Sequence, residues 1–209
     1  MPRIIHPSIA SLTAADGAFL RSLTLPGLKN MVLYGSTSRS QPDIYYAVSS
    51  LYNLIVHSAC ALSSLRIIIS NCAIDQNLIH ILEASPDLTS LGLEFLTWHG
   101  DSVQTIQTLF GRLGSFEHVL IPKLQSLALV LEEADFLGTN FGLFGYLFAY
   151  FVEDRWRKGT LRSVTVTIPW TTSSQPEFPL SQACRETLIK LENEGMDVEF
   201  ISRGASLLL

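Results

Sequence analysis

The five histidines and three cysteines are the side chains of this 209-residue chain best suited to act as nucleophiles, bases or metal ligands. Cys72 lies just before a predicted helix that contains His80, so a thiol–imidazole pair is geometrically conceivable. The chain nevertheless has no G-x-S-x-G, phosphate-binding loop or His-Glu-x-x-His motif, and a packed thiol beside a surface imidazole is the simpler interpretation. We therefore predict no catalytic residue, no cofactor and no metal ion, and a protein that is not an enzyme.

The charged residues exclude one large class of partner. They make up 16% of the chain, and the formal net charge is -5. Nucleic-acid binding requires clustered Lys and Arg, and the basic residues that do cluster stand beside acidic ones, which favours a solvated, locally paired face. We therefore predict no nucleic-acid partner. The basic cluster is Arg155, Arg157, Lys158 and Arg162 beside Glu153 and Asp154, and a separate acidic cluster, Glu132, Glu133 and Asp135, predicts a solvated loop.

No segment of the sequence predicts membrane insertion or export. The uncharged stretch 141–152 is shorter than the roughly 17–25 residues that a spanning helix needs, so it predicts a buried or groove-lining helix. Residues 1–16 lack the continuous apolar stretch of a signal peptide, and the cysteines are too few and too scattered for a disulfide framework. We expect an intracellular protein, cytoplasmic or nuclear, with no membrane partner.

A repeated hexad organises the chain. Its pattern is apolar-x-x-apolar-x-apolar, and its third position is Ser or, once, Asn. A proline precedes the first position by two places in four copies, as Pro7, Pro26, Pro86 and Pro122. A single L-x-x-L-x-L is common in leucine-rich chains, but copies that share a serine column and a leading proline indicate a true repeat. The hexads are 9–14, 28–33, 62–67, 88–93, 124–129 and 161–166.

Each hexad predicts a strand, and the segments between hexads predict helices. The fourth and sixth positions lie on one face of a strand, so stacking parallel strands buries them against returning helices. Helix starts are expected at Asp43, Asp75, Asp101, Asn140 and Ser181, because each precedes apolar residues at helical spacing. Glycines favour helix C-caps at Gly114, Gly159 and Gly195, and residues 196–201 alternate like a terminal strand.

These elements predict an α/β fold of a particular kind. We expect an irregular leucine-rich-repeat solenoid, or horseshoe, with a parallel β-sheet on its concave face and helices behind it. We expect residues 1–209 to form a single domain of this type, the C-terminal part of a longer protein. Serines in the third column can serve sheet packing alone, so the partner-binding residues favoured by type are Tyr34, Arg66 and Glu94, which face outward on three neighbouring strands.

Several phrases resemble fungal F-box proteins with a leucine-rich-repeat-like C-terminal region, over about residues 4–201. These phrases are residues 23–28 (LTLPGL), 88–91 (LTSL), 153–164 (EDRWRKGTLRSV) and 194–198 (EGMDV). The resemblance implies a protein-interaction scaffold that captures a substrate for a ubiquitin ligase. Because this chain opens directly into a repeat, binding of the ligase adaptor is implied only if an F-box lies upstream.

Two other functions fit parts of the pattern. A small-molecule sensor would line an apolar pocket with the 141–152 helix, and a thermal-shift screen of metabolites would separate it from a protein binder. A doubly wound α/β enzyme would also alternate strands and helices, but it needs a glycine-rich turn after a strand, and the sequence has none.

Overall fold

The computed structural model of the chain describes residues 3–35, 42–69, 76–96, 101–115, 119–132, 145–168, 180–202 and 205–206. Strands and helices alternate through most of these residues. The strands are β1 (Ile4–Ile5), β2 (Ser11–Ala14), β3 (Leu23–Thr24), β4 (Asn30–Tyr34), β5 (Ser64–Ile69), β6 (Ser90–Phe95), β7 (Ser126–Leu131), β8 (Ser163–Ile168), β9 (Asp197–Ser202) and β10 (Ala205–Ser206). The helices are α1 (Gly17–Arg21), α2 (Pro42–Ser58), α3 (Gln76–Glu83), α4 (Asp101–Leu113), α5 (Tyr146–Arg157) and α6 (Gln182–Asn193).

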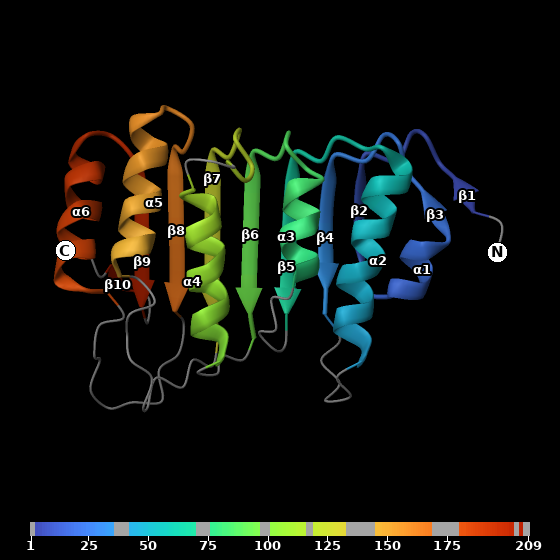
Figure 1. The fold of residues 1–209 in the computed structure, drawn as a ribbon, viewed down its shortest axis with the longest axis horizontal. Helices are drawn as coiled ribbons and strands as arrows, with labels where there is room; N and C mark the ends of the chain where they lie inside the picture. The colour runs from blue at the N-terminus through green and yellow to red at the C-terminus, as the bar shows by residue number, and fades with distance from the viewer. Residues whose placement is uncertain are drawn as a thin grey trace.

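The fold is α/β, with one mostly parallel sheet and a layer of helices on one of its faces (Figure 1). The described strands follow the order β2-β4-β5-β6-β7-β8-β9 and pair in parallel, and β10 closes the far end in antiparallel orientation. A small separate sheet pairs β1 with β3 at the N-terminal end. In a doubly wound sheet the strand order reverses at a switch point, whereas here strand order follows the chain.

The predicted hexads pair in register. Ser90 of β6 lies between Ser64 of β5 and Ser126 of β7, and the same third position continues from strand to strand. The first, fourth and sixth positions of the hexads point into the core, and in the five hexads from residue 28 onward they are at most 1% exposed. These side chains are Leu28, Met31, Leu33, Leu62, Leu65, Ile67, Leu88, Leu91, Leu93, Leu124, Leu127, Leu129, Leu161, Val164 and Val166.

Main-chain hydrogen bonds repeat with the same period at the entrance to each strand. The carbonyl of Ala10 accepts from the amides of Lys29 and Asn30, at 2.8 and 2.9 Å. The carbonyls of Lys29, Ser63, Thr89 and Gln125, at the same hexad position, each accept two amides from the next strand in the same way. The strands are therefore tied together before the ladder begins, which fixes the register of each hexad on the next.

The leading prolines occupy a turn before the hexad. In three units the first leucine donates its amide to the carbonyl three residues earlier, at 3.1–3.2 Å, with the proline second in the turn. Proline favours this position because its fixed φ matches the turn. In the turn that contains Pro26, a Cβ on Gly27 would lie 2.2 Å from the carbonyl oxygen of Pro7, so glycine allows the first two turns to stack. The turns are Leu25–Leu28, Ser85–Leu88 and Ile121–Leu124.

Helix boundaries confirm the expectations in part. Ser181 caps α6 by accepting the amide of Cys184 at 3.2 Å, as predicted. Asp43 is not a cap, because α2 begins one residue earlier at Pro42, which suits the first turn. Gly159 and Gly195 have positive φ angles of 70° and 96°, whereas Gly114 does not adopt this conformation and was wrongly predicted to.

The predicted 141–152 helix begins later than expected. Gly145 is the N-cap of α5, so the helix starts at Tyr146, and residues 141–144 lie outside the described part of the chain. Its apolar side packs into the core, where the ring of Phe110 lies 4.9 Å from that of Phe148 and 6.1 Å from that of Phe151. Among the described residues, no helix is both long and apolar enough to cross a membrane.

Candidate functional site

The face of the sheet opposite the helices, called the open face below, carries the side chains that alternate with the core leucines. In β6, β7 and β8 the buried and half-buried positions alternate strictly along the strand. The half-buried positions are accessible because the helices cover the other face (Figure 1). The open face consists of Ser11, Asn30, Ser64, Ser90, Ser126, Ser163 and Asp197 in one column, and Thr13, Val32, Arg66, Gly92, Ala128, Thr165 and Glu199 in the next. A third column holds Tyr34, Ile68, Glu94, Val130, Thr167 and Ile201.

Two of the three predicted partner-binding residues form an ion pair with each other. Arg66 on β5 reaches diagonally to Glu94 on β6, and the Nη2–Oε2 distance is 2.5 Å. The residue directly opposite Arg66 is Gly92, where an added Cβ would lie 3.3 Å from the Arg66 Cγ, so glycine leaves room for the arginine to lie across the sheet. The pairing was not predicted from the sequence, since it depends on register and on the small residue between the partners.

Arg66 keeps most of its surface in contact with solvent despite this pairing. Its side chain is 55% exposed, whereas that of Glu94 is 14% exposed. The carboxylate thus holds one side of the guanidinium and leaves the remaining donors accessible. The open face therefore presents an oriented cation near its N-terminal half.

Tyr34 lies one strand away from this pair. It ends β4 opposite Ile68, and its ring is exposed, while Ile68 is buried. An exposed aromatic ring beside a buried aliphatic side chain offers apolar contact area together with a phenol hydroxyl. The structure thus places Tyr34, Arg66 and Glu94 on three consecutive strands of one accessible face, as the register predicted.

The third hexad position forms hydrogen bonds between neighbouring strands at two places in its column. The side-chain Nδ2 of Asn30 donates to the hydroxyl of Ser11 at 3.0 Å, and the hydroxyl of Ser163 donates to that of Ser126 at 2.9 Å. These contacts link neighbouring strands, which is the packing role expected of small polar side chains. The column also continues to Asp197, which lies outside the six predicted hexads.

The open face becomes acidic at its C-terminal end. Asp197 and Glu199 on β9 are both exposed and lie in the first and second columns. Their alternation with Val198 and Phe200 was visible in the sequence, and extending the hexad register by one unit would have identified them. Of the predicted acidic loop, Glu132 is half-buried after β7, and Glu133 and Asp135 lie outside the described residues.

Among the described residues, the cysteine and histidine side chains do not come together in a site that could carry chemistry. Cys60 and Cys184 are buried, and burial raises the pKa of both thiols, that of Cys184 to about 12. His80 lies against the ring of Tyr52 at 5.7 Å, and Cys72 is outside the described residues. Within the described ranges, no group of three or more His, Cys, Asp or Glu side chains is arranged to hold a metal ion.

Arg155 corrects the prediction that the basic cluster is wholly solvated. Its side chain is 2% exposed and donates to the carbonyl oxygens of Leu113, Leu120 and Ile121, at 2.6–3.3 Å. Burial lowers the pKa of the guanidinium, and arginine remains charged because its intrinsic pKa is so high. Arg155 therefore ties α5 to the segment between α4 and β7, where Ile121 adopts a positive φ of 49°.

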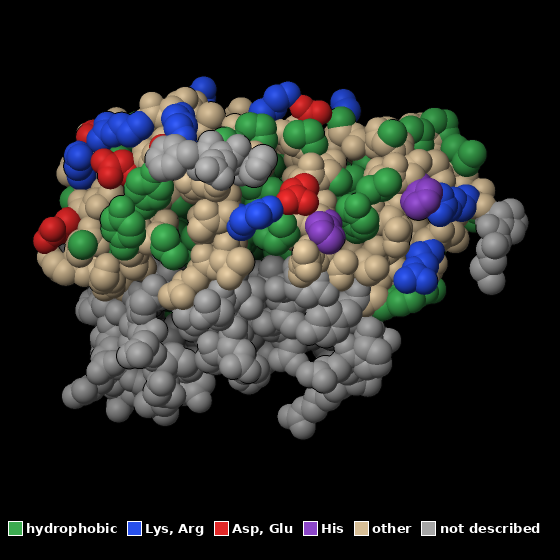
Figure 2. All heavy atoms as spheres, in the orientation of Figure 1, with side chains coloured by type: hydrophobic (Ala, Val, Ile, Leu, Met, Phe, Trp, Pro, Cys, Tyr) green, Lys and Arg blue, Asp and Glu red, His purple; other side chains and the backbone are tan. Residues whose placement is uncertain are grey.

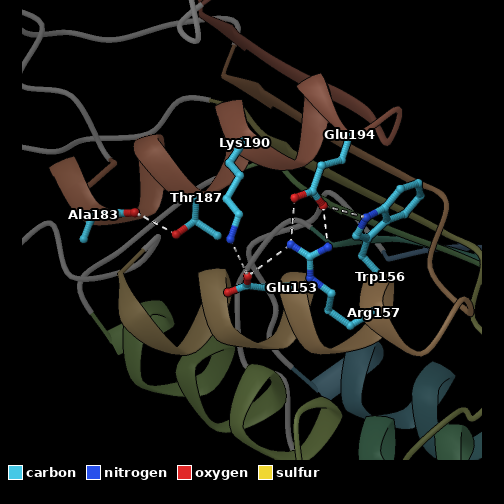
Figure 3. Close-up of polar contacts among 7 residues, drawn as sticks. All are labelled: Glu153, Trp156, Arg157, Ala183, Thr187, Lys190 and Glu194. Atoms are coloured by element: carbon cyan, nitrogen blue, oxygen red, sulfur yellow. Dashed lines mark hydrogen bonds and ion pairs between the residues drawn. The ribbon is translucent and has the colours of Figure 1, made fainter.

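The rest of that cluster is paired on the surface, as predicted. Figure 3 shows Arg157 of α5 directed toward Glu194 after α6, with an Nη1–Oε2 distance of 2.6 Å, while Lys190 reaches Glu153 at 3.3 Å. The hydrogen bond from Arg157 lowers the pKa of Glu194, and the Nε1–H of Trp156 donates to the same carboxylate at 3.3 Å. The network joins helices α5 and α6, and each of these charged side chains has a partner of opposite charge within it.

The helix side offers a different surface. Figure 2 shows hydrophobic side chains dispersed among charged ones of both signs on this side. Neighbouring helices α3 and α4 are bridged by Arg112 and Glu83 at 2.7 Å, beside a shallow groove that is also lined by Val119 and Pro122. Mixed charge and pairing of this kind are typical of a solvated surface.

Comparison of the chain with protein-family models, with curated proteins and with solved structures finds no match.

Proposed function

We propose that the chain is an irregular leucine-rich-repeat solenoid that acts as a protein–protein interaction scaffold, with the open face as its binding surface. The observation that supports this most strongly is the in-register parallel stacking of hexads with one accessible face. Solenoids of stacked repeats use such extended sheets to bind partners.

The composition of the open face supports recognition of a folded or extended polypeptide. Gly92, Ala128 and the hydroxyl side chains give a low floor in the middle of the sheet, where a backbone could approach closely. Tyr34 and Arg66 stand at one side of this floor, and both residue types are enriched at interaction hot spots.

The resemblance to F-box proteins supports a more specific form of this proposal. In that form, the scaffold is the substrate-recognition region of a ubiquitin-ligase receptor. Binding of the ligase adaptor would require an F-box in the same polypeptide, so this part of the proposal is tested separately, by identifying the coding sequence that precedes Met1.

Affinity capture with matched variants tests the binding surface. The double variant Tyr34→Ala with Arg66→Ala removes the aromatic and cationic groups of the open face. A partner that binds this face is expected to be captured at least about tenfold less, which corresponds to the loss of one moderate hot spot. Captured proteins are identified and quantified by mass spectrometry.

The control is the double variant Tyr146→Ala with Arg112→Ala, which removes the same two residue types from the helix side, where both are exposed. Capture by this control should equal that of the unmodified chain. Equal loss in both variants, or loss only in the helix-side control, would contradict the assignment of the open face.

A further inference from the structure

The open face carries its accessible charges at two separate places. Arg66 on β5 is the cation, and its side chain is 55% exposed. Asp197 and Glu199 on β9 are exposed carboxylates, and no described residue forms an ion pair with either of them. The remaining charged residue of the three columns, Glu94, is 14% exposed and already bound to Arg66. The face therefore presents a guanidinium at one place and two carboxylates at the other.

A strip of small, uncharged side chains joins these two places. In the second column, Gly92, Ala128 and Thr165 lie on consecutive strands between Arg66 and Glu199. The first column beside this strip has serine on each strand from β5 to β8. All these residues are half-buried, and none carries a charge. A polypeptide main chain can therefore approach the sheet closely along the strip, since no long side chain stands in its way.

The separation of the charges sets the length of a ligand that bridges them. Strands β5 and β9 are four strand spacings apart in the sheet (Figure 1). Four spacings amount to about 19 Å. An extended polypeptide rises about 3.3 Å per residue, so about six residues cover this distance. A helix rises only about 1.5 Å per residue and would need about 13 residues.

We propose that the open face binds an extended peptide segment that carries a carboxylate and a basic side chain about six positions apart. The carboxylate binds the accessible side of Arg66, and the Lys or Arg of the segment binds Asp197 and Glu199. Glu94 already holds the guanidinium in place, so little conformational freedom of Arg66 is lost on binding. This inference rests on the proposed function and specifies the ligand of the same surface.

The separation of charge also selects against other ligands. A uniformly acidic segment is repelled by the carboxylates of β9, and a uniformly basic one places a cation beside Arg66. Such like-charge contacts lower affinity and favour the ligand of mixed charge. A nucleic acid, which is negative along its whole length, is disfavoured for the same reason.

Selection from a displayed library of random sixteen-residue peptides tests the class of ligand. The enriched sequences are expected to contain Asp or Glu and Lys or Arg five to seven positions apart. Both orders count, because the strip does not set the direction of the bound segment. A synthetic peptide of the enriched sequence, acetylated and amidated so that its termini are uncharged, then gives a Kd by fluorescence anisotropy.

Reversal of the charges on β9 tests the place of binding. Asp197→Lys with Glu199→Lys is expected to weaken binding of the selected peptide at least about tenfold, because like charges then meet. The same variant should bind more tightly than the unmodified chain to a peptide whose basic residue is replaced by Glu. The control is Glu186→Lys with Glu192→Lys, which makes an equal change in net charge at exposed residues of α6. The control should retain the original affinity, and thermal melts followed by circular dichroism establish that both variants are folded.

Three results would overturn the proposal. They are the absence of an enriched motif, opposite charges at another spacing such as the 13 or so positions of a helix, and equal weakening by the β9 and α6 variants. The proposed function fails by a different result. A captured partner that is lost from Tyr34→Ala with Arg66→Ala but is indifferent to the reversal on β9 would leave the open face as the binding surface and remove only the charge motif.

Discussion

The two faces of strand β7 (Ser126–Leu131) differ in burial although their residues alternate along one backbone. Leu127, Leu129 and Leu131 are fully buried against the helices, whereas Ser126, Ala128 and Val130 are half-buried on the open face. The same division holds in β6 and β8. The buried residues of each strand therefore stabilise the fold, whereas the half-buried residues of the open face remain accessible.

This division carries through the charged groups as well. On the helix-covered side, Arg155 is buried, each of its three guanidinium nitrogens donates to a carbonyl group, and it serves the packing of a loop. On the open face, Arg66 is paired on one side only and remains exposed. Two arginines therefore differ in role because one is enclosed by backbone acceptors and the other is held by a single carboxylate.

The largest expected effect compares the two faces on one strand. Leu129→Ala removes a fully buried side chain and is expected to lower the free energy of unfolding by about 2–5 kcal/mol, since it leaves a cavity. Val130→Ala, on the open face of the same strand, should lower it by less than about 1 kcal/mol. Denaturant titration of both variants measures the difference. Similar losses at the two positions would mean that the open face is covered.

A comparable effect is expected from the buried arginine. Arg155→Met fills a similar volume but leaves the carbonyls of Leu113, Leu120 and Ile121 without their donor, so we expect a loss of about 2–4 kcal/mol. The control is Arg157→Met, because Arg157 lies two residues further along α5 on its exposed side. This substitution should lower the free energy of unfolding far less. Denaturant titration compares them, and equal stability of the two variants would refute a structural role for Arg155.

The paired arginine of the open face should contribute little to folding. Arg66→Ala is expected to change the free energy of unfolding by less than about 1 kcal/mol, because exposed ion pairs are screened by solvent. Its effect on partner capture should be larger than its effect on stability. A loss of stability above about 2 kcal/mol would show that the Arg66–Glu94 pair belongs to the core of the fold.

The smallest expected effect concerns the surface network between α5 and α6. Arg157 lowers the pKa of Glu194, so this carboxylate stabilises the fold above the pKa that it has in the unfolded chain. The contribution is lost as the pH falls through the lower pKa of the folded state. Glu194→Gln should therefore lower the Tm slightly at pH 7, and the difference from the unmodified chain should shrink as the pH falls through the folded-state pKa. A difference that grows at acid pH would reverse the assigned sign.

The repeat could be predicted from the sequence because its signals are local. The leucines at the first, fourth and sixth positions, the serine column and the leading prolines each report on a strand or turn that the same residues form. The sheet register then follows by aligning hexads, and it placed Tyr34, Arg66 and Glu94 on neighbouring strands correctly.

The remaining features depend on contacts between distant segments. Arg155 contacts carbonyls 34 to 42 residues earlier in the chain, and nothing in its local sequence distinguishes it from the exposed Arg157. The β1–β3 pair joins two-residue strands that are too short to produce a pattern. Helix α5 starts at Tyr146, after Gly145 as N-cap, although the continuous uncharged run of the sequence begins at Phe141.

Photo-cross-linking from single positions tests the central claim, that the open face is the binding surface, most directly. A photoreactive residue in place of Thr165, in the middle column of the open face, is compared with one in place of Thr108, exposed on α4. A specific adduct to a captured partner from position 165, and none from position 108, is the expected result. Adducts from position 108 alone would place recognition on the helices and contradict the account.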